Sequence, residues 1–370
     1  MLKKYPFIKW TLLFFGSLII FVFAFGWWFI SLLSDNKTYV DISTTQISEL
    51  PYVSQNIISP RGKILAVVTS TDKMGSTDKK TGYELTELSR AYYVFQANGF
   101  EVDIASPEGG NSPVIIDDED MGEFDYAFLN DHIAQDKTKN TMAIKDIDPK
   151  AYEAVFFVGG KGAMFDFPKN KAIQNIIKVL YQSNKVVGAV CHGPAALVNV
   201  TLDTGKPLLE NKKVSGFTNN EELLLISDAK EIFPFLLQDK LMAQGAQFNE
   251  GEMYLENISH DNNLITGQNP WSTWALAETM ISQLGYSPKY RKITDEENAV
   301  KIVSVYKAKG IIEAKEIIEQ MILIENKEIK RELIAQHGIV AVMKGNINRF
   351  FGLVRLVSFV KRTEQNKIKP

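Results

Sequence analysis

Short apolar segments and helical segments alternate for over 200 residues of this chain, from Gly62 onward. The segments "GKILAVVTST", "EVDIASP", "YEAVFFVGG" and "KVVGAV" have the length and composition of strands buried on both faces. "TGYELTELSRAYYVFQANGF" and "NKAIQNIIKVLYQSN" have helical periodicity, and "KKVSGFT" and "NLITGQNP" are predicted as later strands. This alternation predicts an α/β fold, an open and mostly parallel sheet with helices on both faces.

The composition excludes several classes of function. The net charge of −3 gives no general attraction to nucleic acid. Cys191 is the only cysteine, which rules out an intramolecular disulfide and a cysteine-rich metal site. The four histidines do not have the spacing of paired metal ligands, so we expect no metal site.

The N-terminal region contains 24 uncharged residues, Trp10–Leu33. A helix of that length, at ~1.5 Å per residue, is long enough for a bilayer core of ~30 Å. Lysines precede the run at positions 3, 4 and 9, and the positive-inside rule then keeps residues 1–9 in the cytoplasm. The sequence therefore predicts a single-pass membrane anchor over 10–33, a linker over 34–60 and an extracytoplasmic catalytic domain. A cleaved signal peptide is the alternative.

Cys191 lies where a predicted buried strand turns into the segment "GPAALVNV". The small residues around it allow a tight turn, and Pro194 is tolerated at an early helical position. This is the geometry of a nucleophile elbow, in which backbone N–H groups at the start of the helix favour a thiolate. A buried structural cysteine is the alternative.

The segment "AVCHGPAAL" resembles the nucleophile segment of the ThiJ/PfpI superfamily, which has the class I glutamine amidotransferase-like fold, a flavodoxin-like sheet. "TGYELTELSRAYYVFQANGFEVDIASPEGG", "VFFVGGKGAMFDF", "VSGFTNNEE" and "LITGQNPWST" match further family segments in order. The resemblance covers roughly residues 62–286 of a catalytic domain over 61–288 and is strongest to the glyoxalase III-like, heat-shock chaperone-like branch. The late His-x-Glu pair of true glutamine amidotransferases is absent from the sequence.

The resemblance implies roles for Cys191 at the predicted turn and for Glu87 in the first predicted helix. Cys191 matches the nucleophile, and Glu87 matches the acidic residue that hydrogen-bonds its sulfur. A protonated carboxylic acid beside a thiolate stabilises it and can carry a proton. The alternative for Glu87 is a surface ion pair with Arg90, one helical turn further on.

The resemblance also implies a base and oxyanion donors. His192 matches the base, although it could instead be a hydrogen-bonded core histidine. Its acidic partner lies in "TNNEE", where Glu222 is preferred and Glu221 stays open. Gly160 and Gly162 are predicted to help form the oxyanion and substrate site, although strand-end glycines also serve turns.

The implied chemistry is attack of a thiolate on an aldehyde to form a hemithioacetal. Proton movement between adjacent carbons then converts a 2-oxoaldehyde into a 2-hydroxy acid, as from methylglyoxal to lactate, with no cofactor. A cysteine amidase or peptidase of the same superfamily is one alternative. A chaperone or thiol stress sensor without turnover is another. The expected partners are a small carbonyl substrate, the membrane through residues 10–33 and a second copy in a homodimer, but no nucleic acid.

Residues 289–370 lie outside the resemblance and are predicted to form a helical extension broken at Gly310. Its last segment, "INRFFGLVRLVSFVKR", is apolar but too short and too charged to span a bilayer comfortably. Either it packs in a bundle of its own, or it lies on a membrane surface, or it binds a partner.

Overall fold

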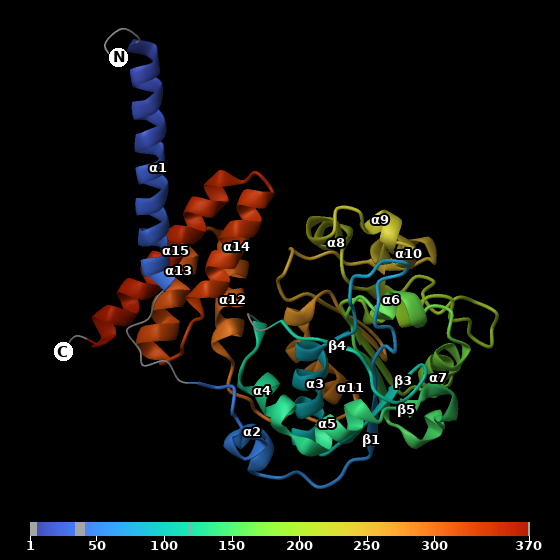
Figure 1. The fold of residues 1–370 in the computed structure, drawn as a ribbon. Coiled ribbons are helices and arrows are strands. Elements are labelled where there is room, and N and C mark those ends of the chain that lie inside the picture. The colour runs from blue at the N-terminus through green and yellow to red at the C-terminus, as the bar shows by residue number, and fades with distance from the viewer. Residues whose placement is uncertain (1–5, 34–40, 118–119, 369–370) are drawn as a thin grey trace. The chain divides into compact units, whose positions relative to one another are not determined.

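A computed structural model describes residues 6–33, 41–117 and 120–368. The described residues form two compact units (Figure 1). One comprises residues 41–292, and the other joins the N-terminal helix to the residues from 293 onward. The predicted N-terminal tail (1–9) and linker (34–60) lie in part outside the described residues, at 1–5 and 34–40.

A seven-stranded sheet organises the larger unit, in the order β10-β11-β7-β6-β1-β3-β5. All neighbouring strands are parallel except β10 and β11. The prediction of a mostly parallel α/β sheet is therefore confirmed. The seven strands are β1 (Lys63–Val67), β3 (Glu101–Ser106), β5 (Met142–Ala143), β6 (Ala154–Phe157), β7 (Val186–Val190), β10 (Ile258–Asp261) and β11 (Leu264–Gly267).

Two small strand pairs lie outside this sheet. β2 (Tyr83–Glu84) pairs with β4 (Val114–Ile115), and β8 (Lys213–Val214) pairs with β9 (Gln247–Phe248). The predicted strand "KKVSGFT" thus contributes only two residues, and it does so to a minor pair rather than to the main sheet.

Helices cover both faces of the main sheet, as predicted. From β1 the chain passes through α3 to β3, towards the β5 edge of the sheet. From β6 it passes through α7 to β7, towards the β10 edge. Because parallel crossovers are right-handed, α3 and α7 lie on opposite faces, and α11 packs beside α3 (Figure 1). The α-helices of this unit are α2 (Pro51–Ser54), α3 (Leu85–Ala97), α4 (Glu123–Asn130), α5 (His132–Lys139), α6 (Ala163–Asp166), α7 (Lys171–Gln182), α8 (Asn219–Leu225), α9 (Ala229–Ile232), α10 (Leu237–Ala243) and α11 (Thr273–Gln283).

The central strands are apolar along their whole length because helices cover both of their sides. Every residue of β6 and of β7 is buried. The chain reverses its direction of progress between β1 and β6, which makes this the switch point of the sheet. In open α/β sheets, ligand sites form beyond the carboxyl ends of the strands at such a point.

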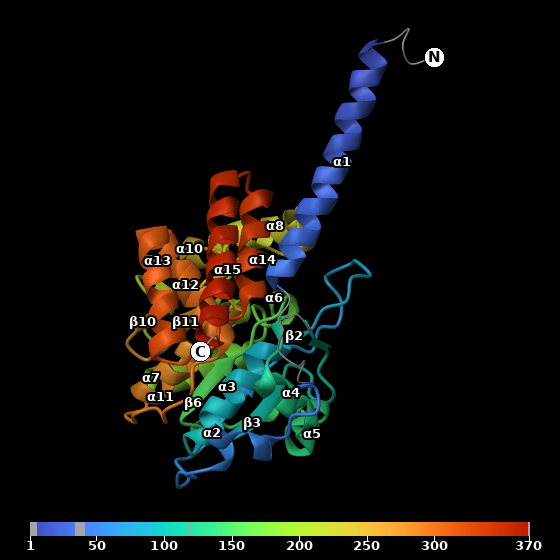
Figure 2. The same ribbon diagram turned by 90° about the vertical axis from the view of Figure 1, so that its left-hand side faces the viewer.

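The smaller unit is helical, which confirms the predicted C-terminal helices. It contains α12 (Asp295–Lys309), α13 (Ile311–Glu319), a π-helical turn (Gln320–Ile324), α14 (Arg331–Met343) and α15 (Ile347–Ile368). The four α-helices run side by side in both views (Figures 1 and 2). Gly310, with φ of +96°, separates α12 from α13 at the predicted break. Helix α15 buries Leu353, Leu356, Val357 and Val360, which fits the bundle alternative.

The predicted membrane anchor is not supported. Residues 10–33 form most of α1 (Pro6–Leu33). Within the ranges that the structure describes, however, no helix combines the length and the apolar character needed to cross a membrane. The prediction of a transmembrane segment was therefore wrong. The cytoplasmic N-terminus and the extracytoplasmic catalytic domain were inferred from that segment alone, so this topology is wrong with it.

The C-terminal turn of α1 is bound by cations from the helical bundle. Arg331, only 2% exposed, donates to the carbonyl oxygens of Leu32 (2.6 Å) and Leu33 (3.3 Å). Lys361 donates to the carbonyl oxygen of Ser31. The last carbonyls of a helix lack intrahelical donors and carry partial negative charge, so these cations cap α1.

Replacing Arg331→Met should lower the free energy of unfolding by about 2–4 kcal/mol, because one buried and one partly buried carbonyl lose their donor. Glu364, 3.6 Å from the Arg331 Nε, also loses this cation. Urea denaturation followed by circular dichroism measures the effect. Arg355→Met, at an exposed position of α15, is the control and should change stability by less than about 0.5 kcal/mol. Equal stability of the two variants would contradict the capping role.

Candidate active site

Cys191 lies at a sharp turn between β7 and the 3₁₀ helix η6 (Gly193–Leu197). Its φ of +57° is uncommon for a residue with a side chain, and such strained conformations concentrate at functional sites. The backbone is held on both sides, since the Cys191 N–H donates to Gly267 and the Cys191 carbonyl accepts from Phe217, each at 2.9 Å. The elbow thus has the predicted form, although the helix after it is a single short 3₁₀ segment.

His192 connects the sulfur to a buried carboxylate. The Cys191 Sγ lies 3.3 Å from His192 Nδ1, and His192 Nε2 lies 2.6 Å from the Glu222 Oε2. All three side chains are buried, and the ring of Phe217 packs against the imidazole with centroids 4.5 Å apart. Burial acts to raise the pKa of Glu222, but the charge and hydrogen bond of His192 outweigh it and hold the pKa below its usual value.

Glu221 and Glu222 are adjacent at the start of α8 but have different environments. Glu221 accepts hydrogen bonds from Thr218 in a capping box, and further ones from the backbone of Tyr254 and the amides of Gln268 and Asn269. Its carboxylate therefore holds the surrounding loops together. The structure places Glu222, the preferred of the two candidates, against His192.

Glu87 lies in the first turn of α3 and is fully buried beside the elbow. Its Oε2 accepts the N–H of Gly159 at 2.7 Å. Burial, and then the charge of Glu84, raise the pKa of Glu87 well above its usual value, which favours its protonated form. Arg90 instead pairs with Asp125 at 3.1 Å, so the predicted alternative of a surface pair with Glu87 does not form.

The electrostatics of this site favour a neutral thiol at rest. Burial raises the pKa of Cys191 well above its usual value, and Glu87 acts in the same direction whenever it is ionised. The positive charge of Lys161 acts against them. Ionisation of the sulfur therefore needs a base within reach, and His192 is positioned to be that base.

The glycine loop after β6 brings backbone close to the sulfur. A Cβ on Gly159 would lie 2.9 Å from the Cys191 Cβ, so only glycine fits there. Gly160, with φ of +94°, packs against the carbonyl of Gly82, and Gly162 packs against Thr69. Both predicted glycines thus have a packing reason to be small, and their part in an oxyanion site stays a prediction.

Two charged residues beside this site were not predicted from the sequence. Burial raises the pKa of Glu84 to about 7, although the charge of Lys161 opposes this. Lys161 lies between Gly160 and Gly162 in the loop after β6. The sequence contains a weak indication of both residues. Glu84 precedes Glu87 by one helical turn, and a lysine between two loop glycines is not expected to pack in the core. Within the described ranges, no group of three or more His, Cys, Asp or Glu side chains could hold a metal ion.

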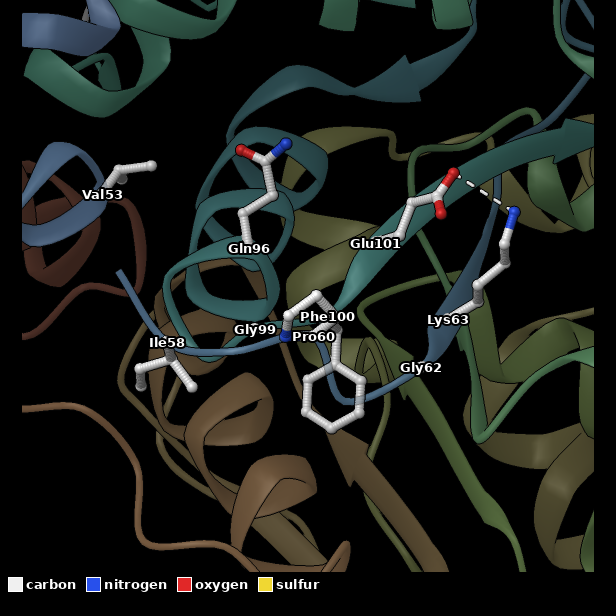
Figure 3. Close-up of a pocket in the computed structure, with 9 residues that line it drawn as sticks. All are labelled: Val53, Ile58, Pro60, Gly62, Lys63, Gln96, Gly99, Phe100 and Glu101. Carbon is white, nitrogen blue, oxygen red and sulfur yellow. Dashed lines mark hydrogen bonds and ion pairs between the residues drawn. The ribbon is translucent and has the colours of Figure 1, made fainter. Parts of the chain in front are cut away.

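A separate pocket lies at the opposite end of the sheet (Figure 3). It surrounds Lys63 and Glu101, whose side chains form an ion pair at 3.2 Å across the first residues of β1 and β3. The other lining residues are Val53, Ile58, Pro60, Gly62, Gln96, Gly99 and Phe100. Because these are the amino ends of parallel strands, this pocket is distinct from the site of Cys191 at their carboxyl ends.

The sequence matches the DJ-1/PfpI family over residues 79–283, which include Cys191, His192, Glu87 and Glu222. The chain belongs to this family. Glyoxalase 3 of Candida albicans is 33% identical over 232 residues, which are 60% of this chain and 97% of that protein. The glutathione-independent glyoxalase HSP31 of Saccharomyces cerevisiae is 31% identical, and the match covers 61% of this chain and 99% of the HSP31 chain.

Solved structures of family members agree with this assignment. The rapid encystment protein of 24 kDa from Francisella tularensis is 36% identical, with a TM-score of 0.58. The match covers 60% of this chain and 99% of the Francisella chain. Glyoxalase III of Candida albicans gives a TM-score of 0.55 at 31% identity, over 60% of this chain and 97% of its own. These similarities account for about three-fifths of the chain.

Glu84→Gln should make stability less dependent on pH. The pKa of Glu84 rises from 4.5 to about 7 on folding, so the folded state keeps a proton that the unfolded state releases between these pH values. The free energy of unfolding therefore falls as pH rises through this window. Glutamine carries no such proton, so the variant should exceed the wild type by roughly 2–3 kcal/mol at pH 8 and by little at pH 4.

Urea denaturation of both proteins at pH 4, 6 and 8 measures this difference. Glu108→Gln removes an exposed carboxylate and is the matched control, for which we expect no trend with pH. A stability difference between Glu84→Gln and wild type that is the same at all three pH values would show that the Glu84 carboxyl is not titrating in this window.

Proposed function

We propose that this chain is a glutathione-independent glyoxalase that converts a 2-oxoaldehyde, with methylglyoxal as the test substrate, into a 2-hydroxy acid without a cofactor. The chain covers almost the whole length of two relatives named as glyoxalases, from Candida albicans and Saccharomyces cerevisiae. The observation that carries the proposal is the buried series Cys191–His192–Glu222, with separations of 3.3 and 2.6 Å. This series supplies a nucleophile, a base and an orienting carboxylate in one place.

The first step is the addition of the Cys191 sulfur to the aldehyde carbon. His192 Nδ1 takes the thiol proton as the S–C bond forms, and the aldehyde C=O bond becomes an alkoxide. The Glu222 carboxylate holds the imidazole and stabilises its positive charge. Returning the proton to the alkoxide gives a neutral hemithioacetal and leaves His192 able to act again.

The second step moves a proton between the two substrate carbons. His192 removes the proton from the carbon bonded to sulfur, which gives an enediolate, and delivers it to the neighbouring carbon. The hydroxyl proton on the sulfur-bearing carbon moves to the oxygen of that neighbouring carbon, so that the C=O bond of the product forms next to sulfur. The product is a thioester of a 2-hydroxy acid. Water then cleaves the thioester, which releases the acid and restores the thiol, so the overall reaction adds one water to the oxoaldehyde. Glu87 lies beside the sulfur, and in its protonated form it can donate a hydrogen bond that stabilises the thiolate.

The full-length chain, incubated with methylglyoxal and without glutathione, should release lactate, which NMR detects. Cys191→Ala should reduce the rate to background, a loss of at least about 10³-fold, because no other thiol can form the hemithioacetal. Lactate at equal rates from both proteins would contradict the proposal. Absence of turnover, with cleavage of a peptide amide that depends on Cys191, would favour the cysteine hydrolase alternative.

Glu222→Gln should lower kcat for the same substrate by roughly 10–100-fold with a smaller change in KM, because an uncharged amide no longer stabilises the imidazolium. Steady-state kinetics of lactate formation measure both parameters. Glu231→Gln, an exposed change on the nearby helix α9, should leave both parameters at wild-type values. An unchanged kcat in Glu222→Gln would exclude the carboxylate from the mechanism.

A further inference from the structure

Lys161 is held close to the candidate site by the geometry of its loop. The loop connects β6 to α6 and is fixed on one side by Gly159, whose N–H donates to Glu87 and whose Cα faces the Cys191 side chain. On its other side, Gly162 packs against Thr69. The backbone of Lys161 therefore has little freedom, and its position follows from contacts that also fix the site.

The ammonium group of Lys161 is available to a ligand. The side chain is half-buried, and among the described residues its ammonium group forms no hydrogen bond or ion pair. Its free donors can bind an anionic group that enters the site.

Acidic groups from several elements lie within electrostatic reach of this ammonium. Its positive charge acts to lower the pKa of three groups, although burial raises the first two overall. These groups are Glu84 of β2, Cys191 at the elbow and Glu222 of α8. Three other titratable groups face the sulfur. They are His192, Glu87 of α3 and Glu221 of α8. Of the groups that act on the thiol, Lys161 acts to lower its pKa by positive charge, whereas the charge of Glu221, and that of Glu87 when it is ionised, act to raise it.

We propose that the Lys161 ammonium group is a further catalytic group of this site, which stabilises negative charge first on the Cys191 sulfur and then on the oxygen of the attacked carbonyl. The inference rests on the proposed function, because the anionic oxygens are those of its alkoxide and enediolate steps. A fixed cation in a site shielded from water stabilises such charge far more than it would in water.

Two variants separate charge from shape. Lys161→Met removes the charge and keeps most of the length, whereas Lys161→Arg keeps the charge. Lys169→Met, an exposed change eight residues further on, makes the same change in net charge away from the site and is the control. Circular dichroism and thermal unfolding of all four proteins establish that they are equally folded.

The first measurement is the rate of alkylation of Cys191 by iodoacetamide as a function of pH. Because the chain has a single cysteine, the reaction reports this thiol alone. In Lys161→Met, we expect the midpoint of the profile to move to higher pH and the rate at pH 7.5 to fall about 10-fold, while Lys161→Arg stays near wild type. This assay needs no turnover, so it tests the inference even if no lactate is formed.

The second measurement is lactate formation from methylglyoxal. We expect kcat to fall about 10–100-fold in Lys161→Met with a smaller change in KM, and to recover most of its value in Lys161→Arg. Wild-type alkylation and kinetics in Lys161→Met would overturn the inference. Equal losses in the Met and Arg variants would also overturn it, because positive charge would then not be the property that matters. Failure of the wild type to form lactate would instead contradict the proposed function.

Discussion

The strained turn at Cys191 determines where every other functional group of this protein must lie. With φ of +57°, the chain leaves β7 so sharply that the sulfur and the next side chain, His192, both face the same buried space. This conformation is stable only because its surroundings fix it, through hydrogen bonds to Gly267 and Phe217 and through glycines where the neighbouring loops approach most closely. A site made from adjacent residues on a rigid strand end requires little ordering when substrate binds.

The same burial that excludes water creates an electrostatic difficulty. Glu87 lies beside a thiol that must become negative, Glu84 acts on Glu87, and the pKa values of all three groups are raised by burial. Protonating Glu87 removes one negative charge and turns an acceptor into a donor. The His192–Glu222 pair supplies a base whose own charge is balanced. Burial thus favours an uncharged thiol at rest, and negative charge develops on the sulfur only as it attacks, which is when stabilising that charge accelerates the reaction.

The parts of the site that depend on local sequence could be predicted, and the parts that depend on long-range packing could not. Cys191 and His192 are neighbours at a recognisable strand end, and Glu87 was expected beside them from the family resemblance of the segment that forms α3. The choice between Glu221 and Glu222 depends on a difference of about 100° around a helix, which only the capping box of α8 defines. Glu84 and Lys161 act through space across loops, and sequence spacing gives only a weak indication of such distances.

For the N-terminal segment, a strong local sequence pattern led to the wrong prediction of a transmembrane helix. Composition predicted a helix over 10–33 correctly, because apolar residues without proline favour that conformation. The environment of a helix, however, is decided by what its ends and sides contact. The terminal carbonyls of α1 are bound by Arg331 and Lys361, and Phe25 and Phe29 pack against Phe350. Since these partners are 298 residues or more away in the chain, no window of the sequence around α1 contains them.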